Sequence, residues 1–281
     1  MNSISVIMTV CNAENIIAEA IESVLKQSFT GFEIIIVNSG STDNTHSLIS
    51  SYDDERISII NNNGQDLVQS LNSGIKASTG KYIALHDANS IMHIDRLKLQ
   101  YSVMEEYPEI TVCSSWETVF GQTIPKRILE QKICGRVELP LVQLLLDDLT
   151  ISSSYTVRRS FITENHLIYE NNDHIKDYKF WVETAKLNGG FYIDSQPLVY
   201  RRIREAGNLK EYRAEQSQFL LKIKKDIVET LCEKYIDKYP ALTNLYNSYY
   251  DLFEQKLISE NEIFHLFHSL FIKNKEVFQS L

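Results

Sequence analysis

The sequence predicts an α/β fold in which helices cover a mixed, mostly parallel sheet. Two observations support this prediction. Short apolar runs of strand length alternate with longer segments of helical spacing, four times within about the first hundred residues. One of these runs, Ile34–Val37, is apolar throughout, as is typical of a strand buried on both faces of a parallel sheet. Sequential strands joined by helices therefore build one sheet with right-handed crossovers.

Each element is predicted from its own pattern. Apolar runs indicate strands, and apolar residues repeated every three to four positions indicate helices with one buried face. The predicted strands of the first hundred residues are Ile4–Thr9, Phe32–Val37, Arg56–Ile60 and Tyr82–Leu85, and the helices are Glu14–Lys26, Thr42–Tyr52, Asp66–Ala77 and Asp95–Glu106. Further along, strands are predicted at Ile110–Val119, Ser152–Arg158 and Phe191–Tyr200, with a helix at Asp177–Leu187, and Thr123–Asp148 is ambiguous.

The composition changes after about Asn208. Glycine is absent from there to the end, and Lys, Glu, Tyr, Leu and Phe dominate, which predicts two or three helices. We therefore expect an α/β domain over residues 1–207 and a helical C-terminal extension over residues 208–281. An aromatic stripe in this extension has three interpretations: packing within the protein, a homodimer interface, or peripheral membrane association. The many acids of the extension favour the dimer over the membrane.

Composition and charge exclude several classes of protein. The chain has 281 residues, 43% of them hydrophobic, and a net charge of -9, which argues against a nucleic-acid partner. Its four cysteines have neither zinc spacing nor the pattern of a disulfide framework. The N-terminus lacks the features of a signal peptide, and no apolar run approaches the roughly 20 residues of a membrane helix. We expect a cytoplasmic protein, with the inner face of the membrane as the alternative location.

The segment FEIIIVNSGSTD places polar residues where a ligand would bind. Its apolar run ends at Asn38, Ser39 and Gly40, and ligands of open α/β sheets bind at the carboxyl ends of strands. Ser41–Asp43 is predicted to cap the following helix, and Gly40 is predicted to permit the turn.

Four segments, in this order, resemble the inverting family 2 glycosyltransferases. They are SVIMTVCNAENIIAEAIESVLKQSFTGFEIIIVNSGSTDNT, NSGIKASTGKYIALHDANSIMHIDRL, KDYKFW and PLVYRRI, and the resemblance covers roughly residues 3–205. It implies the GT-A fold, with helices on both faces of the sheet. It also implies a nucleotide-sugar donor of the UDP or GDP type and a glycan or lipid-linked acceptor.

The resemblance assigns the nucleotide-sugar contacts. Backbone at the end of the first strand would meet the base and ribose, although Cys11 stands where an aromatic residue is frequent. An amide replaces the usual carboxylate at Asn38 but still offers an acceptor and two donors to a base. The expected nucleotide-sugar-binding residues are Thr9, Val10, Asn12, Glu14, Asn38, Gly40, Asp87 and Arg204.

Asp87 and Asn89 match the family's Asp-x-Asp metal motif. A dication there, Mn²⁺ or Mg²⁺, would neutralise charge that develops on the leaving diphosphate. Asn89 ligates only through a neutral carbonyl, and Ser90 replaces another residue that is often acidic, so the resemblance implies a weakened metal site. A plain polar turn is the alternative interpretation.

Asp177 is the expected catalytic base, with Asp173 as its substitute. An inverting transfer needs a base for the acceptor proton, and the family uses an acid at the start of this helix. The first hypothesis is therefore an active glycosyltransferase of bacterial surface polysaccharide synthesis. The second is a catalytically weakened nucleotide-binding relative or partner subunit, suggested by the missing acids. A nucleotidyltransferase is the third hypothesis. It is disfavoured because this chain lacks the glycine-rich basic loop that would hold a triphosphate.

Overall fold

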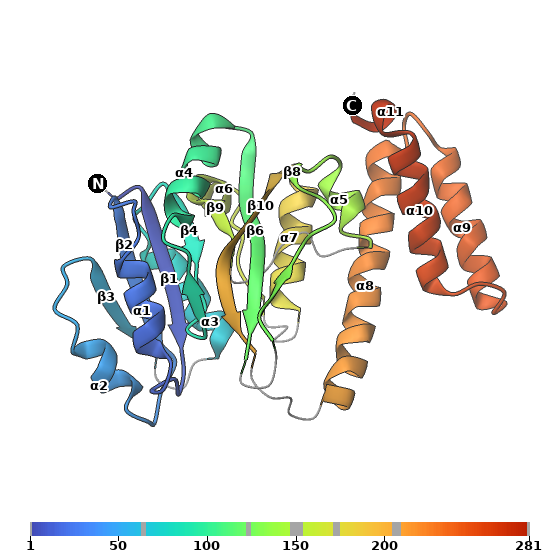
Figure 1. Ribbon diagram of the computed structural model, residues 1–281. Coiled ribbons are helices and arrows are strands. Elements are labelled where there is room, and N and C mark those ends of the chain that lie inside the picture. Colours follow the sequence, from blue (N-terminus) through green and yellow to red (C-terminus); the bar gives the residue numbers. More distant parts are fainter. Residues whose placement is uncertain are drawn as a thin grey trace. The chain divides into compact units, whose positions relative to one another are not determined.

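The computed structural model describes residues 2–62, 66–121, 125–146, 154–170, 175–203 and 209–279 (Figure 1). The chain divides into two compact units. Unit 1 consists of Met1–Val137, Thr150–Phe180 and Gly189–Ala206, and unit 2 consists of Glu138–Leu149, Trp181–Asn188 and Gly207–Leu281. The expected division at residue 207 stays a prediction.

Unit 1 contains one mixed sheet with the strand order β3-β2-β1-β4-β9-β6-β10-β5, to which β7 and β8 add at β6 and β10. The long ladders, β1 with β2 and β4, β2 with β3, and β6 with β10, are parallel, and the antiparallel pairings span only two or three residues. The strands are β1 (Ile4–Val10), β2 (Phe32–Asn38), β3 (Ile57–Asn61), β4 (Tyr82–Leu85), β5 (Ser90–Met92), β6 (Ile110–Phe120), β7 (Arg127–Leu129), β8 (Gly135–Arg136), β9 (Thr156–Arg158) and β10 (Gly190–Arg202). The predicted fold class is confirmed.

Helices cover both faces of this sheet. Alternate residues of β1 and β2, such as Val6 and Ile34, share a buried cluster with residues of α1 and α4. On the opposite face α3 approaches closely, since a Cβ on its Gly74 would lie 2.5 Å from Ile7. The helices of unit 1 are α1 (Ile17–Leu25), α2 (Thr45–Ser50), α3 (Leu67–Ala77), α4 (Arg96–Glu106), α6 (Arg159–Glu164) and the start of α7 (Lys176–Lys186).

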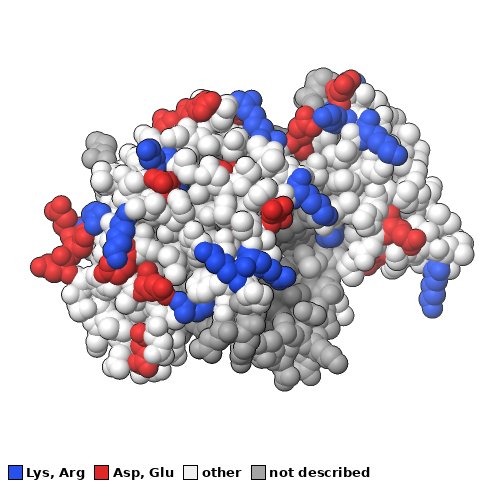
Figure 2. All heavy atoms as spheres, in the orientation of Figure 1, with Lys and Arg blue, Asp and Glu red and all other residues white. Residues whose placement is uncertain are grey.

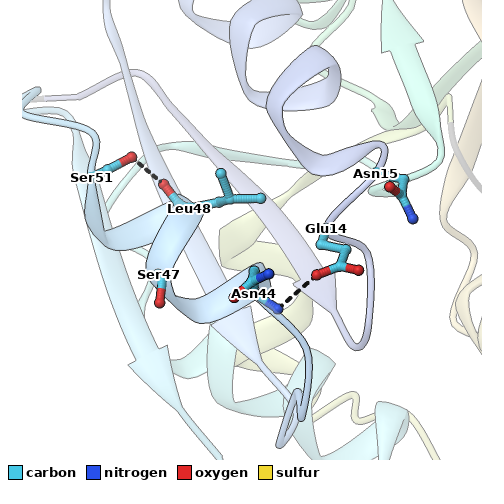
Figure 3. A pocket seen from close by; sticks show the side chains of 6 residues that line it. All are labelled: Glu14, Asn15, Asn44, Ser47, Leu48 and Ser51. Carbon is cyan, nitrogen blue, oxygen red and sulfur yellow. Dashed lines mark hydrogen bonds between the residues drawn. The ribbon is translucent and has the colours of Figure 1, made fainter.

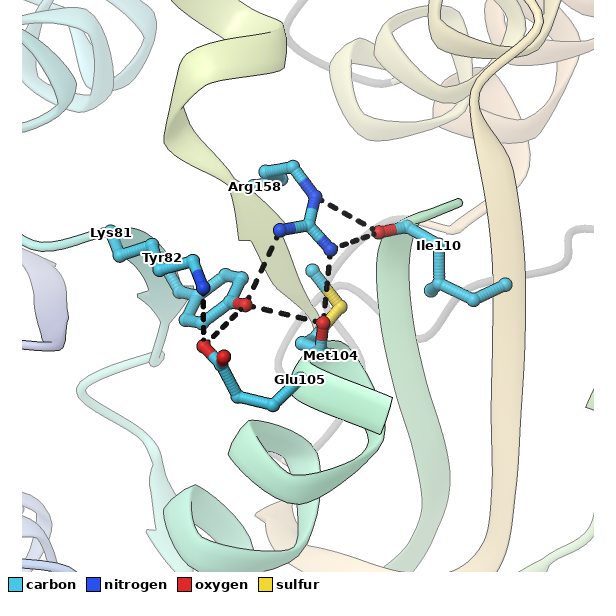
Figure 4. A network of polar contacts seen from close by, with 6 residues as sticks. All are labelled: Lys81, Tyr82, Met104, Glu105, Ile110 and Arg158. Atoms are coloured by element: carbon cyan, nitrogen blue, oxygen red, sulfur yellow. Dashed lines mark hydrogen bonds and ion pairs between the residues drawn. The ribbon is translucent and has the colours of Figure 1, made fainter. Parts of the chain in front are cut away.

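The short strand β9 joins the parallel half of the sheet, β3-β2-β1-β4, to β6 and β10. It is antiparallel to both β4 and β6. Arg158 at its end donates to the carbonyl oxygens of Met104 and Ile110 and to the Tyr82 hydroxyl, as Figure 4 shows. This guanidinium ties β9, the end of α4 and the start of β6 together. The predicted strand Ser152–Arg158 is confirmed in its last three residues.

Two elements differ from their predicted limits. The helix predicted to begin at Thr42 begins at Thr45, and the side chain of its N-cap residue, Asn44, does not bond the helix. Asp43 of the predicted capping segment does accept from the Thr45 amide, and Glu14 accepts from the Asn44 amide. The strand predicted to end at Tyr200 continues as β10 to Arg202 alongside β6, so Arg201 and Arg202 are its last residues.

Unit 2 is helical in the part of it that the structure describes. Its helices are α5 (Pro140–Gln143), the end of α7, α8 (Leu209–Tyr235), α9 (Ala241–Glu254), α10 (Glu260–Lys273) and α11 (Lys275–Gln279). Helices α8 to α11 lie in the described part of the C-terminal extension, which therefore holds more helices than the predicted two or three. Its aromatic residues pack on one another, with Tyr235 against Phe271 and Phe278, and Tyr246 against Phe267. None of the helices in the described ranges is long and apolar enough to span a membrane.

Acidic and basic side chains are interspersed on the face of the molecule shown in Figure 2. Among the ion pairs of unit 1, Lys81 with Glu105 is exposed, and such exposed pairs contribute little to stability, about 0–1 kcal/mol each.

Candidate active site

The loops that follow β1 and β2 are hydrogen-bonded to each other. The Asn12 amide donates to Ser41 Oγ at 3.1 Å, and Asn12 Oδ1 accepts from the Thr42 amide at 2.8 Å. Asn12 has a φ of 49° and Gly40 a φ of 75°, and asparagine and glycine are the residues that tolerate this region best. The two loops thus form one polar wall at the carboxyl end of the parallel strands.

A second set of bonds extends this wall outward. Glu14 Oε2 accepts from the Asn44 amide at 2.9 Å, and Asp43 accepts from the amides of Glu14 and Thr45. Hydrogen bonds from Thr45, above all, lower the pKa of Asp43. Figure 3 shows the open hollow beside these residues, with the Glu14 carboxylate turned toward Asn44. In this arrangement Glu14 stabilises the start of α2, and its contact with a ribose stays a prediction.

Asn38 and Ser39 are engaged within the wall. Asn38 is buried, its Oδ1 accepts from the Ser41 amide, and its Nδ2 donates to Asn61 Oδ1 at 3.2 Å. Ser39 Oγ donates to Ser70 Oγ at 2.7 Å. Asn38 keeps one amide hydrogen for another acceptor.

Asp87 follows β4 on a turn that the protein core supports. Beneath it, the buried guanidinium of Arg96 donates to the carbonyl oxygens of Leu85 and Tyr155, and so joins the ends of β4 and β9. No residue in the described ranges donates a hydrogen bond to the Asp87 carboxylate. Burial, and then the nearby charge of Asp177, raises the pKa of Asp87. The neighbouring His86 is buried, which lowers its pKa to about 3 and keeps the imidazole neutral.

Asp177 lies in the first turn of α7 and faces the same region. Lys176 Nζ is 2.9 Å from Asp177 Oδ2, and both side chains are mostly buried, with 15% and 19% exposed. Burial, and then the charge of Asp177, acts on the pKa of the Tyr169 hydroxyl, which places that hydroxyl close to the Asp177 carboxylate. The hydroxyls of Tyr155 and Tyr169 are hydrogen-bonded to each other. When Tyr155 is the donor in that bond, the Tyr169 hydrogen is left for the Asp177 carboxylate, which only accepts.

Tyr169 is itself held firmly. Its backbone exchanges two hydrogen bonds with the side chain of Asn72 on α3, at 2.8 and 2.9 Å. Its ring stacks on Phe180 of α7 with the centroids 4.3 Å apart. Burial, followed by the Asp177 charge, raises its pKa well above the usual range, so the phenol stays protonated. Tyr169 can therefore orient Asp177 without competing for a proton.

A third carboxylate completes the site. Glu117 of β6 is 1% exposed, and Arg201 of β10 donates to both of its oxygens, with Nε at 2.9 Å from each. Charged groups that reach the Asp87 carboxyl are Asp177, Lys176, Arg201 and Glu117. Three acids and two cations thus share one region, to which the turn after β4 and the elements β6, β10 and α7 contribute. Such an arrangement can hold a charged ligand and accept a proton.

A search against protein families matches this chain to the model described as glycosyl transferase family 2, over residues 5–180. The matched segment contains Asp87, Glu117, Tyr169 and Asp177. The chain belongs to glycosyl transferase family 2.

Relatives of known sequence and structure agree. An uncharacterised glycosyltransferase of Haemophilus influenzae is 30% identical over 234 residues, which are 79% of this chain and 72% of the relative. UDP-Glc:alpha-D-GlcNAc-diphosphoundecaprenol beta-1,3-glucosyltransferase WfgD of Escherichia coli is 25% identical over 66% of this chain and 70% of its own. Two longer Rickettsia relatives are matched over only 29% and 32% of their length.

Among solved structures, S. aureus TarS in complex with UDP-GlcNAc superimposes with a TM-score of 0.66. The match is 17% identical and covers 85% of this chain and 73% of TarS. At this identity the likeness shows the GT-A fold, and the chain is a GT-A glycosyltransferase of family 2.

Family 2 enzymes commonly use a divalent metal, and the residues here fit one only in part. The described ranges contain no group of three His, Cys, Asp or Glu residues that could hold an ion. Asp87 and the Asn89 carbonyl remain, and magnesium sites often combine one or two carboxylates with substrate phosphates. The set thus fits an ion that takes most of its ligands from a diphosphate. The roles of Arg204 and Asp173 lie outside the described residues.

The structure adds residues that sequence reasoning had not singled out, namely Glu117, Tyr155 and Tyr169. Glu117 could have been noticed as a lone acid within the strand-like run of β6. The tyrosines gave no such signal, because they flank β9 and α7 in stretches without clear periodicity. Arg201 joins these residues through its pair with Glu117.

Proposed function

We propose that this family 2 enzyme transfers a sugar from a UDP- or GDP-type donor to a glycan or lipid-linked acceptor, with inversion, in bacterial surface polysaccharide synthesis. The observation that supports the proposal is that Asp87, after β4, and Asp177, on α7, lie in one region, where burial and then the Asp177 charge raise the pKa of Asp87. The family resemblance assigns both acids to the site. The names of WfgD and TarS support a UDP sugar as the first donor to test.

In the proposed reaction, the acceptor oxygen forms a bond to the anomeric carbon while the bond from that carbon to the diphosphate breaks. The acceptor proton passes to Asp177, which Tyr169 and Lys176 hold in place. The electron pair of the broken bond stays with the diphosphate. Mn²⁺ or Mg²⁺ bound by Asp87 and Asn89 would supply charge neutralisation there. One displacement at the anomeric carbon gives inversion.

A second candidate function is nucleotide binding without efficient transfer, in a weakened relative or a partner subunit. It is favoured by Asn38, Ser39, Asn89 and Ser90, amides and hydroxyls where the family often has acids. A homodimer through the C-terminal helices, peripheral membrane association and a cytoplasmic location stay predictions.

Calorimetric titration with UDP, GDP and their sugars, with and without Mn²⁺, tests the donor site. We expect micromolar binding that Mn²⁺ strengthens and that Asp87→Ala weakens at least about tenfold, since Asp87 is the one charged residue of the metal motif. Binding that neither Mn²⁺ nor Asp87→Ala affects would favour the weakened relative. No binding to any nucleotide in either condition would exclude the proposed transferase.

Tyr169→Phe is expected to lower kcat by about tenfold to a hundredfold while leaving the affinity for UDP unchanged. The substitution removes a hydroxyl placed to donate to the Asp177 carboxylate, and a hydrogen bond to a charged group is worth roughly 1.5–3 kcal/mol. Initial rates and calorimetry separate the two effects. Tyr155→Phe removes only the hydrogen bond between the hydroxyls of Tyr155 and Tyr169, so it should lower kcat less. A loss of UDP affinity without a loss of kcat would contradict the positioning role.

A further inference from the structure

Lys176 is an unexpected residue at the start of α7. Its ammonium group lies 2.9 Å from the Asp177 carboxylate. A cation at a helix N-terminus is opposed by the positive end of the helix dipole. The side chain is also mostly buried, which costs a strongly hydrated lysine part of its solvation. The pair with Asp177 offsets part of these two costs.

The surrounding charges suggest what Lys176 does. Arg201 donates through Nε and Nη2 to the carboxylate of the buried Glu117, which largely neutralises the Arg201 charge. Lys176 contacts Asp177 and also reaches the Asp87 carboxyl with its charge. It thus lies among the acids of the donor site on a flexible stem, as a compact cation with three donors.

The metal motif beside it has lost charge. Asn89 offers a neutral carbonyl where a carboxylate is frequent, so a dication there is held less strongly. A leaving diphosphate nevertheless needs positive charge. A lysine ammonium is a common partner of phosphate oxygens, and such charge-assisted bonds are about twice as strong as neutral ones.

We propose that Lys176 donates to the diphosphate of the bound donor and takes over part of the role of the divalent cation. This inference rests on the proposed function. It makes nucleotide binding less dependent on metal than in a relative with two acids in the motif and no lysine at this position. In the free protein the ammonium is kept at the site by its pair with Asp177.

The test compares Lys176→Met with Lys176→Arg and with Lys179→Met. Lys179 lies one turn along the same helix and pairs with Glu170, outside the site, so it is a matched control. Binding of UDP and of GDP is measured by calorimetry in EDTA and in Mn²⁺. Circular dichroism and thermal unfolding verify that each variant is folded.

Wild type is expected to bind UDP or GDP in EDTA, and Lys176→Met to bind at least about tenfold more weakly. Mn²⁺ should restore much of this loss, so that the gain from metal is larger in Lys176→Met than in wild type. Lys176→Arg should retain binding, and Lys179→Met should match wild type. If Mn²⁺ strengthened nucleotide binding by the same factor in Lys176→Met as in wild type, the inference about Lys176 would be overturned and the proposed function would stand. Failure of wild type to bind either nucleotide in both conditions would overturn the proposed function as well.

Discussion

Asp177→Asn is expected to reduce kcat by about a thousandfold while UDP affinity changes little. The substitution preserves the shape of the side chain and can still accept from Tyr169, but an amide cannot take the acceptor proton. General bases of this kind contribute about 10²–10⁴ in rate. Initial rates with a UDP sugar, together with calorimetry, provide the measurement.

Glu183→Gln is the matched control for Asp177→Asn, because Glu183 is an acid on the same helix whose partner is Lys186. It should leave kcat near that of wild type. An Asp177→Asn enzyme with normal turnover would rule out Asp177 as the base. A nuclear magnetic resonance spectrum of the wild-type product should show the anomeric configuration opposite to that of the donor.

Arg201→Met is expected to lower the free energy of unfolding by about 3 kcal/mol. It leaves the Glu117 carboxylate, which is 1% exposed, without its bidentate partner. Removing one member of a buried pair typically costs about 3–5 kcal/mol. We expect the lower end of that range, because a third of the Arg201 side chain is exposed. Chemical denaturation followed by circular dichroism measures the change.

The neighbouring residue gives a sharp comparison. Arg202 pairs with the half-exposed Glu19, so Arg202→Met should cost no more than about 1 kcal/mol. The double variant Glu117→Gln/Arg201→Met should recover part of the stability lost in Arg201→Met, since it leaves no unpaired charge. Equal losses for Arg201→Met and Arg202→Met would show that burial of Glu117 does not decide the effect.

The regular half of the fold could be predicted because its signals are local. The run in β2 is apolar on both faces, and α3 begins and ends within a residue of its predicted limits. The antiparallel position of β9 could not be predicted, because three residues pair with two strands distant in sequence. Likewise, the start of α2 depends on Glu14, which comes from another loop.

The candidate site divides in the same way. Asp87 and Asp177 could be named as candidates because short motifs surround them, and their roles stay predictions. Their neighbours could not be predicted, since the position of Tyr169 beside Asp177 depends on Asn72, which is 97 residues from Tyr169 in sequence. The pair of Glu117 and Arg201 likewise requires that β6 and β10 be neighbours, which only the completed sheet determines.

The paired loops after β1 and β2 have a consequence for the thermodynamics of binding. Asn12, Ser41 and Thr42 already hold each other before any ligand arrives. Ordering a loop costs conformational entropy, and a preorganised surface avoids most of that cost. A nucleotide that binds here would then retain more of its interaction energy as affinity. We accordingly expect Asn12 variants to weaken binding because the two loops are less ordered before the nucleotide binds, and not because a contact with the base is lost.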